Sequence, residues 1–174
     1  MDTGTDWLHR QCGAVVRAQL ERLISLNRTR TDLGKKFEEL IEEYNSGGKN
    51  IDDLLDFLRE LSQEESRHVR EHLSEEELVI LDILTRPAPD LTTEERAEIK
   101  KVSKQLLTKL KGLLVLDWRK RQSAQAKVRD TIKDVLDQGL PRAYSPELYE
   151  QKCAVIFEHI YESYPQSGEG VYYC

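Results

Sequence analysis

The sequence contains few aromatic residues and no long apolar run. Phe, Trp and Tyr make up 7% of the 174 residues, and the hydrophobic residues together make up 39%. No apolar stretch approaches the roughly 20 residues that cross a bilayer, so we expect no membrane partner. The length allows one domain with a substantial core or two small ones. This composition suits an all-helical protein with one apolar stripe on each helix.

Cysteine usage and the absence of phosphate-binding motifs exclude several kinds of site. Cys12, Cys153 and Cys174 are odd in number and widely spaced, which predicts free thiols in a reducing cytoplasm rather than a disulfide framework or a zinc site. The acidic residues 1–6 lack the basic and apolar regions of a signal peptide. There is no Gly-x-x-x-x-Gly-Lys loop and no Gly-x-Gly-x-x-Gly turn, so nucleotide hydrolysis by this segment is not expected.

Two short patterns imitate metal-dependent catalytic motifs. Residues His68–His72 fit the His-x-x-Glu-His pattern, in which two imidazoles on one helix bind zinc. Their surroundings are densely charged, however, and no third ligand accompanies them. Asp90, followed by Glu98 and Lys100, imitates a magnesium nuclease pattern, but residues two apart do not share a helical face. A metal-dependent hydrolase is therefore the least supported function, and we expect no metal site.

Cys153 and His159 are the remaining pair that could suggest nucleophilic catalysis. They are separated by six positions on the same expected helix, and such spacing does not make them neighbours around it. A buried cysteine and a hydrogen-bonded histidine are the preferred interpretation. We predict no catalytic residue and no cofactor in this chain.

Apolar residues spaced three and four apart predict an all-α fold of about seven helices, arranged as an orthogonal or elongated bundle without a sheet. Start signals are Asn50, the capping boxes that begin at Ser74 and Thr92, and the pair Ser145-Pro146. Glycine and proline clusters end several helices. The expected helices lie within residues 6–26, 32–45, 51–61 with an extension as far as 72, 75–84, 93–110, 113–136 and 146–164.

The weakest point in the helical pattern is the polar stretch 62–74. It divides the chain into an N-terminal helical part, residues 1–62, and a C-terminal helical bundle, residues 63–174. The alternative is a bend within one long helix. Both interpretations are compatible with one continuous fragment of a larger subunit.

Basic residues are concentrated between Lys100 and Lys133. This stretch has 11 basic and 2 acidic residues, a net charge of +9, whereas the whole chain carries −6 and the remainder therefore −15. Such asymmetry indicates either an anionic partner or internal pairing with the acidic helices. The candidate residues for contact with the DNA backbone are Lys100, Lys101, Lys104, Arg119, Lys120, Arg121, Lys127 and Arg129.

Aromatic residues near the basic stretch and in the last helix suggest a protein interface, because tyrosine and tryptophan are enriched in contact surfaces. The candidate interface residues are Trp118, Phe157, His159, Tyr161 and Tyr164. The alternative is that Trp118 is a core residue and the last helix packs on its own domain. The segment Leu113–Trp118 then anchors the core, and the function of the cluster Arg119–Arg121 stays open.

Several short motifs, in order, resemble one known family. They include Asn27–Arg30, Phe37–Asn45, Leu73–Leu78, Leu81–Pro87, Leu113–Arg119, Leu140–Pro141 and Phe157–Tyr161. Together they are similar to the C-terminal helical region of type I restriction enzyme endonuclease (R) subunits. The resemblance covers most of the chain.

This resemblance implies a non-catalytic fragment of a large motor subunit. In that family a nuclease domain and two RecA-like ATPase domains, which use ATP and magnesium, precede the helical region. The family's catalytic residues have no counterparts here, so none is carried over. The implied role is assembly in the cytoplasm with the methyltransferase and specificity subunits and with the rest of the R subunit. The alternative is a sequence-independent contact with the DNA backbone.

Overall fold

The computed structural model describes residues 3–165 and 170–173, with no account of the side chains of residues 3–12 and 173. Over this part of the chain there are eight α-helices, three short 3-10 helices and no strand. The predicted all-α class is confirmed, and the helix beyond the expected seven is the single turn at Arg67–Arg70. The chain forms two compact units, Met1–His72 and Leu73–Cys174, which we call the N-terminal and C-terminal units.

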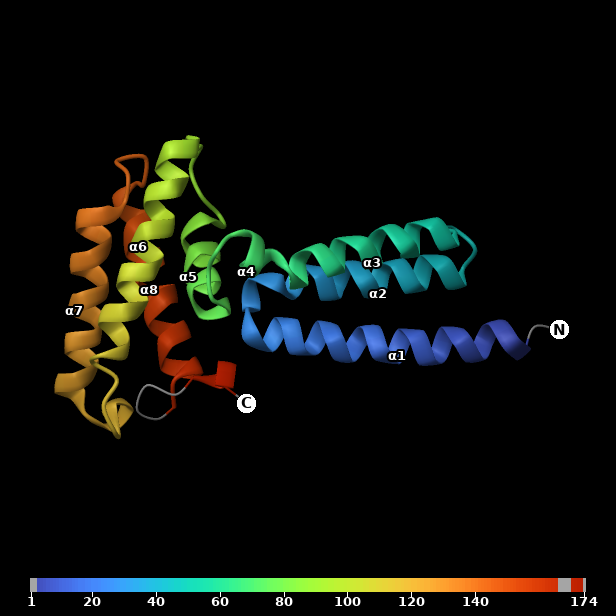
Figure 1. Ribbon diagram of the computed structural model, residues 1–174, viewed down its shortest axis with the longest axis horizontal. Coiled ribbons are helices and arrows are strands. Elements are labelled where there is room, and N and C mark those ends of the chain that lie inside the picture. Colours follow the sequence, from blue (N-terminus) through green and yellow to red (C-terminus); the bar gives the residue numbers. More distant parts are fainter. Residues whose placement is uncertain (1–2, 166–169, 174) are drawn as a thin grey trace. The chain divides into compact units, whose positions relative to one another are not determined.

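The N-terminal unit contains three long helices joined by two turns (Figure 1). They are α1 (Thr3–Leu26), α2 (Thr31–Asn45) and α3 (Ile51–Glu65), with the 3-10 helix η1 (Arg28–Arg30) before α2 and the short α4 (Arg67–Arg70) after α3. The second turn contains Gly47 at φ +80, a conformation that glycine adopts without strain. The side chain of Asn50 then accepts hydrogen bonds from the backbone of α3's first turn, as its sequence predicts.

The described core of the N-terminal unit is small. Phe37 of α2 and Phe57 of α3 stack with ring centroids 5.4 Å apart, and α2 packs against both α1 and α3. The buried apolar residues are Val16, Leu20, Leu23, Phe37, Phe57 and Leu61. Among the residues whose burial is described, α1 thus contributes three of these core residues, α2 one and α3 two.

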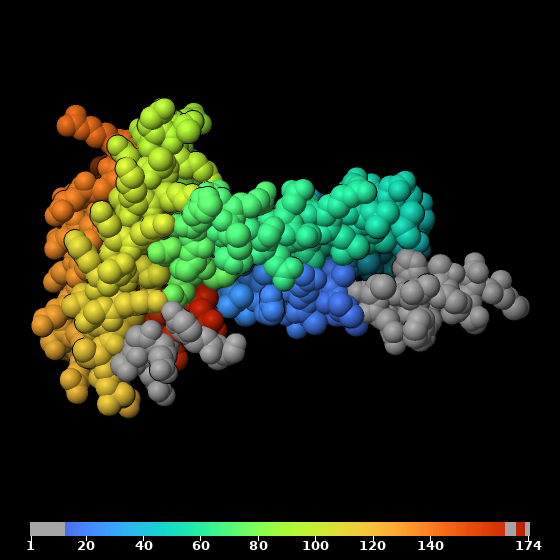
Figure 2. All heavy atoms as spheres, in the orientation of Figure 1, coloured from blue at the N-terminus to red at the C-terminus, as the bar shows by residue number. Residues whose placement is uncertain are grey.

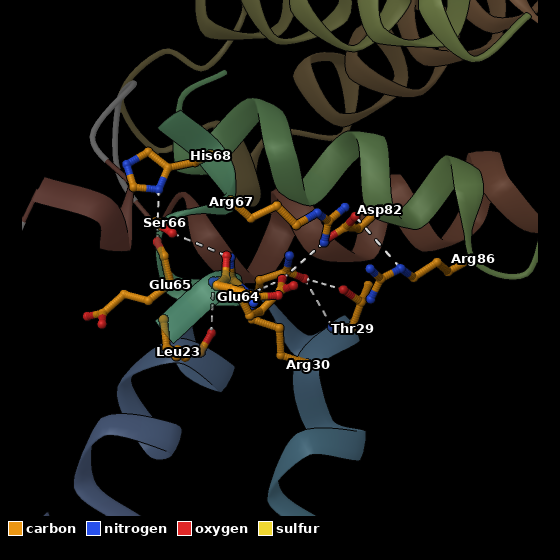
Figure 3. A network of polar contacts seen from close by, with 12 residues as sticks. Leu23, Thr29, Arg30, Glu64, Glu65, Ser66, Arg67, His68, Asp82 and Arg86 are labelled. Carbon is orange, nitrogen blue, oxygen red and sulfur yellow. Dashed lines mark hydrogen bonds and ion pairs between the residues drawn. The ribbon is translucent and has the colours of Figure 1, made fainter. Parts of the chain in front are cut away.

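A buried ion cluster connects α4 to the rest of the N-terminal unit. The Glu64 carboxylate lies 3.1 Å from Arg30 Nε and 3.0 Å from Arg67 Nη1, and Figure 3 shows both guanidinium groups directed at it. Arg30 is 1% exposed and Arg67 is 8% exposed. Residues 63–72, which the sequence-based division placed with the C-terminal bundle, belong to the N-terminal unit, because α3 continues to Glu65 and α4 is attached through this cluster.

The C-terminal unit contains four helices, each packed against two others (Figure 1). In chain order they are α5 (Glu75–Thr85), α6 (Thr93–Lys111), α7 (Gln122–Gly139) and α8 (Pro146–Ser163), with η2 (Trp118–Lys120) before α7 and η3 (Val171–Tyr173) near the end. The side chains of Ser74, Thr92 and Ser145 cap α5, α6 and α8. All three start positions agree with the capping signals in the sequence.

Helix α5 is the most buried element of this unit. Its buried residues are Glu76, Leu78, Val79, Ile80, Leu81, Asp82, Ile83 and Leu84, and it packs against α6 and α8. On the other side of the unit, α6 and α7 approach closely at Gly139, where an added Cβ would lie 2.4 Å from Val102 Cγ2. A larger residue at this position would force the two helices apart.

Candidate functional site

The turn between α6 and α7 exposes apolar residues beside a buried anchor. Leu114 is 3% exposed, whereas Val115 is 47% and Leu116 63% exposed. Asp117 then adopts φ +58, a left-handed conformation that aspartate tolerates better than most residues. This reversal directs the chain from the exposed pair into η2.

Trp118 attaches η2 to α8. It is fully buried, and its indole Nε1–H donates a hydrogen bond of 2.9 Å to the Tyr164 carbonyl oxygen. Its ring meets Phe157 and Tyr161 edge-on, with centroids 6.5 and 5.7 Å apart. Tyr164 is also fully buried. Both side chains are therefore core residues beneath this surface, and neither is accessible to a partner.

Arg119 covers the outer side of this aromatic group. Its guanidinium carbon lies 4.8 Å from the Tyr161 ring centroid, and Nη2 donates a hydrogen bond of 2.9 Å to the Glu162 carbonyl oxygen. Its Nε is buried and has no hydrogen-bond acceptor among the described residues. The guanidinium is thus held on α8 by a cation–π contact and a hydrogen bond to a backbone carbonyl.

Arg129 of α7 makes a similar contact with another aromatic residue of α8. Its guanidinium carbon lies 4.1 Å from the Phe157 ring centroid. Lys133 follows on the same side of α7, 3.5 Å from Glu150 of α8. We call the surface formed by Arg119, Arg129, Phe157 and Tyr161 the arginine–aromatic face.

A shallow groove of about 250 Å³ lies between α7 and α8 beside this face. It is lined by Arg129, Lys133, Glu150, Cys153, Ala154 and Phe157. Burial raises the pKa of the Cys153 thiol and also that of the Tyr149 hydroxyl, which donates to the Lys133 carbonyl oxygen over 2.9 Å. Burial thus favours the neutral thiol of Cys153, which is a poor nucleophile.

His159 is oriented by residues other than Cys153. Its Nδ1 lies 3.2 Å from Ser163 Oγ and its Nε2 lies 3.2 Å from Tyr172 Oη. The half-buried imidazole therefore ties the end of α8 to η3. This is the hydrogen-bonded histidine that the sequence favoured, together with a buried Cys153.

The sequence-predicted basic residues occupy several different surroundings. Lys100, Lys101 and Lys104 lie within one arc of α6, and Figure 2 shows α6 (yellow-green to yellow) along the visible face of the unit. Lys120 lies 3.0 Å from Asp117, and Arg121 is exposed at the start of α7. Lys127 and Arg129 point to different sides of α7, because residues two positions apart are separated by about 200° around a helix.

The two metal-binding patterns do not form the geometry that their motifs need. Helix α4 ends at Arg70 and His72 has φ +52, so His68 and His72 are not one turn apart on a helix. Glu98 and Lys100 lie within α6, as the sequence predicts. Across the described residues, no group of three His, Cys, Asp or Glu side chains could hold a metal ion.

In the sequence, the arginines and the aromatic residues form two separate candidate sites. The structure brings members of both sets together, since Arg119 and Arg129 lie on Tyr161 and Phe157. The exposed Val115 and Leu116 were not among the predicted site residues. Their apolar run was visible, but its exposure depends on the left-handed turn at Asp117.

Comparison with known proteins gives a consistent assignment. Residues 6–166 match the family model described as "Type I restriction enzyme HindI endonuclease subunit-like, C-terminal". A Methanocaldococcus jannaschii protein named "Putative type I restriction enzyme MjaIXP endonuclease subunit" is 24% identical over 127 residues, which cover 67% of this chain and 12% of that protein. No solved structure shows a significant match.

Among the described residues, none of the helices is both long and apolar enough to span a bilayer. The family model covers nearly the whole chain, including both compact units. The chain thus belongs to the family of C-terminal regions of type I restriction enzyme HindI endonuclease subunit-like proteins.

Proposed function

We infer that this chain is a non-catalytic helical domain of an ATP-dependent type I restriction endonuclease and DNA-translocase subunit, and that it assembles with the methyltransferase and specificity subunits. The matched segment of the chain spans only 12% of the length of its Methanocaldococcus jannaschii relative. The nuclease and ATPase chemistry, with its ATP and magnesium, would then belong to other parts of the parent subunit, in the cytoplasm.

The observation that carries this proposal is an exposed apolar pair on a rigid support. Val115 and Leu116 are exposed immediately before Trp118, whose indole is fully buried and hydrogen-bonded to α8. The arginine–aromatic face adjoins this support through Trp118's contacts with Phe157 and Tyr161. Arginine and tyrosine are enriched among energetically important interface residues, and exposed apolar residues gathered beside them indicate an interaction surface.

Reconstitution of the full endonuclease subunit with its methyltransferase complex tests the proposal. Leu116→Asp should weaken assembly at least tenfold, because it replaces one member of the apolar pair with a charged residue. Titration of the labelled endonuclease subunit with the methyltransferase complex measures this effect. Val155→Asp is a matched control, since Val155 is also exposed, at 38%, but on α8 outside the arginine–aromatic face. Unchanged assembly in Leu116→Asp would contradict this docking surface, and unchanged assembly after deletion of residues 73–174 would contradict the assembly role.

A second candidate function is contact with the DNA backbone through α6. Lys100, Lys101 and Lys104 share one arc of that helix, and Lys101 and Lys104 are exposed. Phosphate contacts of this kind would be independent of sequence and would weaken steeply with salt.

Binding of the 174-residue chain to a duplex of random sequence at low and moderate salt separates the two functions. Replacing all three lysines by glutamine should remove DNA binding without affecting assembly. The control is replacement of Lys35 and Lys49, in the N-terminal unit, by glutamine. Absence of binding by the unmodified chain at low salt would exclude the DNA function.

A further inference from the structure

The groove between α7 and α8 has a floor that favours an apolar side chain. Cys153 is 6% exposed, and burial raises the pKa of its thiol, so it contributes as a small neutral apolar group. Ala154 and Phe157 complete the floor. The volume of about 250 Å³ is below the roughly 300–1,000 Å³ of typical small-molecule pockets. The groove therefore suits side chains of a polypeptide better than a free small molecule.

The rim of the groove has a surplus of positive charge. Arg129 and Lys133 line it together with one carboxylate, that of Glu150. Glu150 lies 3.5 Å from Lys133, so this carboxylate is already paired with the lysine. Within the described part of the chain, the Arg129 side chain makes a cation–π contact with Phe157 and no hydrogen bond or ion pair. Its guanidinium can therefore bind a carboxylate that a partner supplies.

A second cation lies over the next ring along α8. Arg119 contacts Tyr161, whose ring centroid is 6.1 Å from that of Phe157. This spacing is close to the roughly 5–6 Å that separates side chains three or four positions apart on a helix. The Arg119 Nε is buried without an acceptor among the described residues. Because both arginines are already held on rings, pairing them with carboxylates costs less side-chain entropy than pairing free arginines would.

We propose that the groove and the arginine–aromatic face bind an acidic amphipathic helix of a partner subunit. An apolar side chain of that helix fills the groove over Ala154 and Phe157, and two carboxylates one turn apart pair with Arg119 and Arg129. Arginine–carboxylate pairs are often bidentate, which adds geometric specificity to the attraction. This inference rests on the proposed function, because it names the chemistry of the surface that meets the arginine–aromatic face during assembly.

Nucleic acid is a poorer occupant of this face. A phosphate backbone would contact the arginines but would leave the apolar floor of the groove without a partner. It would also approach the Glu150 carboxylate at the rim, which repels phosphate. The exposed Val115 and Leu116 nearby likewise favour a polypeptide that combines apolar and acidic side chains.

A designed peptide tests the proposal with the complete 174-residue chain. The probe is an 18-residue fluorescent helical peptide with leucine at heptad positions a and d and glutamate at e and g. We expect saturable binding that weakens as salt rises, because screening reduces the attraction between exposed charges. A peptide with lysine in place of every glutamate should bind at least tenfold more weakly.

Charge reversal in the chain identifies the contact. Arg129→Glu should weaken binding of the glutamate peptide at least tenfold and should strengthen binding of the lysine peptide, because specificity depends on repulsion as well as attraction. Arg142→Glu is the matched control, since Arg142 is exposed in the connection between α7 and α8 and does not line the groove. The affinity of this control for each peptide should be unchanged.

Filling the groove separates the apolar contact from the charge. Ala154→Phe keeps both arginines and should weaken binding of the glutamate peptide at least fivefold, because it occupies the space for the leucine side chain. Val155→Phe, at the next and also exposed position of α8 outside the groove, should bind as the unmodified chain does. Circular dichroism establishes that each variant keeps its helices, and Arg129→Gln serves instead if the charge reversal loses helicity.

Several results would overturn the proposal. They are equal binding of the two peptides, equal effects of Arg129→Glu and Arg142→Glu, equal effects of Ala154→Phe and Val155→Phe, and absence of binding by the unmodified chain. Binding of a random-sequence DNA duplex that Arg129→Glu abolishes would also overturn it, because it would assign the face to nucleic acid.

The same variants in the reconstituted endonuclease subunit distinguish this inference from the proposed function. If Leu116→Asp weakens assembly and Arg129→Glu does not, the acidic partner helix is excluded while the docking function stands. If deletion of residues 73–174 leaves assembly unchanged but the chain binds the glutamate peptide with the expected specificity, the assembly role fails and the peptide-binding surface stands.

Discussion

At the scale of single residues, the C-terminal unit buries charged groups where hydrogen-bonding partners surround them. Glu76 of α5 is 5% exposed. Its carboxylate accepts hydrogen bonds from Tyr164 Oη over 2.7 Å and from Lys111 Nζ over 2.5 Å. One carboxylate therefore connects α5 with α6 and with the end of α8.

Replacement of Glu76 by glutamine should destabilise the protein. The amide removes the charge that Lys111 pairs with and adds two donors beside a hydroxyl and an ammonium group, so we expect a loss of about 1–3 kcal/mol in the free energy of unfolding. Urea denaturation at pH 7 measures it. Glu98→Gln, on the exposed side of α6, should change stability by less than about 0.5 kcal/mol. Equal effects of the two substitutions would show that the Glu76 contacts do not contribute.

Tyr144 should make the stability of the protein depend on alkaline pH. Burial, followed by the charge of Glu95, raises the pKa of Tyr144 to about 12 from its ordinary 10.0, and its hydroxyl donates to the Leu84 carbonyl oxygen over 2.8 Å. The folded state thus holds this proton more tightly than the unfolded state does. Its contribution is complete below pH 10 and is lost as pH rises toward 12.

Comparison with Tyr144→Phe isolates this contribution. The substitution should cost about 1 kcal/mol at pH 7, through loss of the hydrogen bond. Between pH 10 and 12 the unmodified protein should lose up to about 2 kcal/mol more than the variant. Guanidinium denaturation at each pH measures the difference. Parallel stability curves for the two proteins would contradict a raised pKa at this position.

At the scale of elements, the C-terminal end of α5 is completed by other parts of its unit. Lys152 of α8 is 3% exposed, and its Nζ donates to the carbonyl oxygens of Ile83 and Arg86 over 2.6 and 3.2 Å. Tyr144 supplies the donor to Leu84 between them. The last turn of a helix leaves carbonyl groups without helical partners, and here α8 and the turn before it satisfy them.

Lys152→Met should destabilise α5 by removing the donor for two carbonyl groups, with a cost of about 1–3 kcal/mol. Burial lowers the pKa of Lys152, so the unfolded state binds its proton more tightly. Stability of the unmodified protein should therefore rise with pH between the folded pKa and 10.5, and the variant should lack this rise.

Urea denaturation from pH 7 to pH 10 measures both effects of Lys152→Met. Lys104→Met, at an exposed position of α6, provides the control. If Lys152→Met is as stable as Lys104→Met at neutral pH, the lysine does not cap α5. If both variants gain stability equally with pH, the titrating group is another residue.

Helix boundaries were largely predictable, because they depend on local chemistry. Asn50, Ser74, Thr92 and Ser145 each cap the helix that their sequence context indicated. The segment 112–121 was harder, since its path depends on the left-handed Asp117 and on a hydrogen bond from Trp118 to a residue 46 positions away.

The arrangement of the candidate site could not be predicted from spacing alone. The cation–π contacts join Arg119 to Tyr161 and Arg129 to Phe157, and both depend on how α7 and α8 pack. The exposure of Ile51, Leu55 and Leu58 was also not predictable from the sequence, because their spacing is that of a core face. Periodicity identifies an apolar side of a helix but not whether the same chain covers it.

At the scale of the whole molecule, the basic stretch is balanced largely within its own unit. Residues 73–174 contain 15 basic and 17 acidic residues, although residues 100–133 alone carry +9. Lys111, Lys120 and Lys133 pair with acidic residues of the same unit. Internal pairing therefore accounts for part of the asymmetry.

The two units should also differ in stability. Among residues whose burial is described, the core of the C-terminal unit contains 24 buried apolar residues, whereas that of the N-terminal unit contains six. Because buried apolar area is the main source of folding free energy, residues 73–174 should fold alone. Residues 1–72 should unfold at lower temperature.

Thermal unfolding of the two fragments and the whole chain, followed by circular dichroism, measures this difference. Fragment 73–174 should be helical and melt in one cooperative transition. Leu81→Ala in that fragment should lower its midpoint, since removal of a fully packed leucine costs about 2–5 kcal/mol. A fragment 73–174 that is unfolded alone would contradict the division, as would a fragment 1–72 that melts at a higher temperature than fragment 73–174.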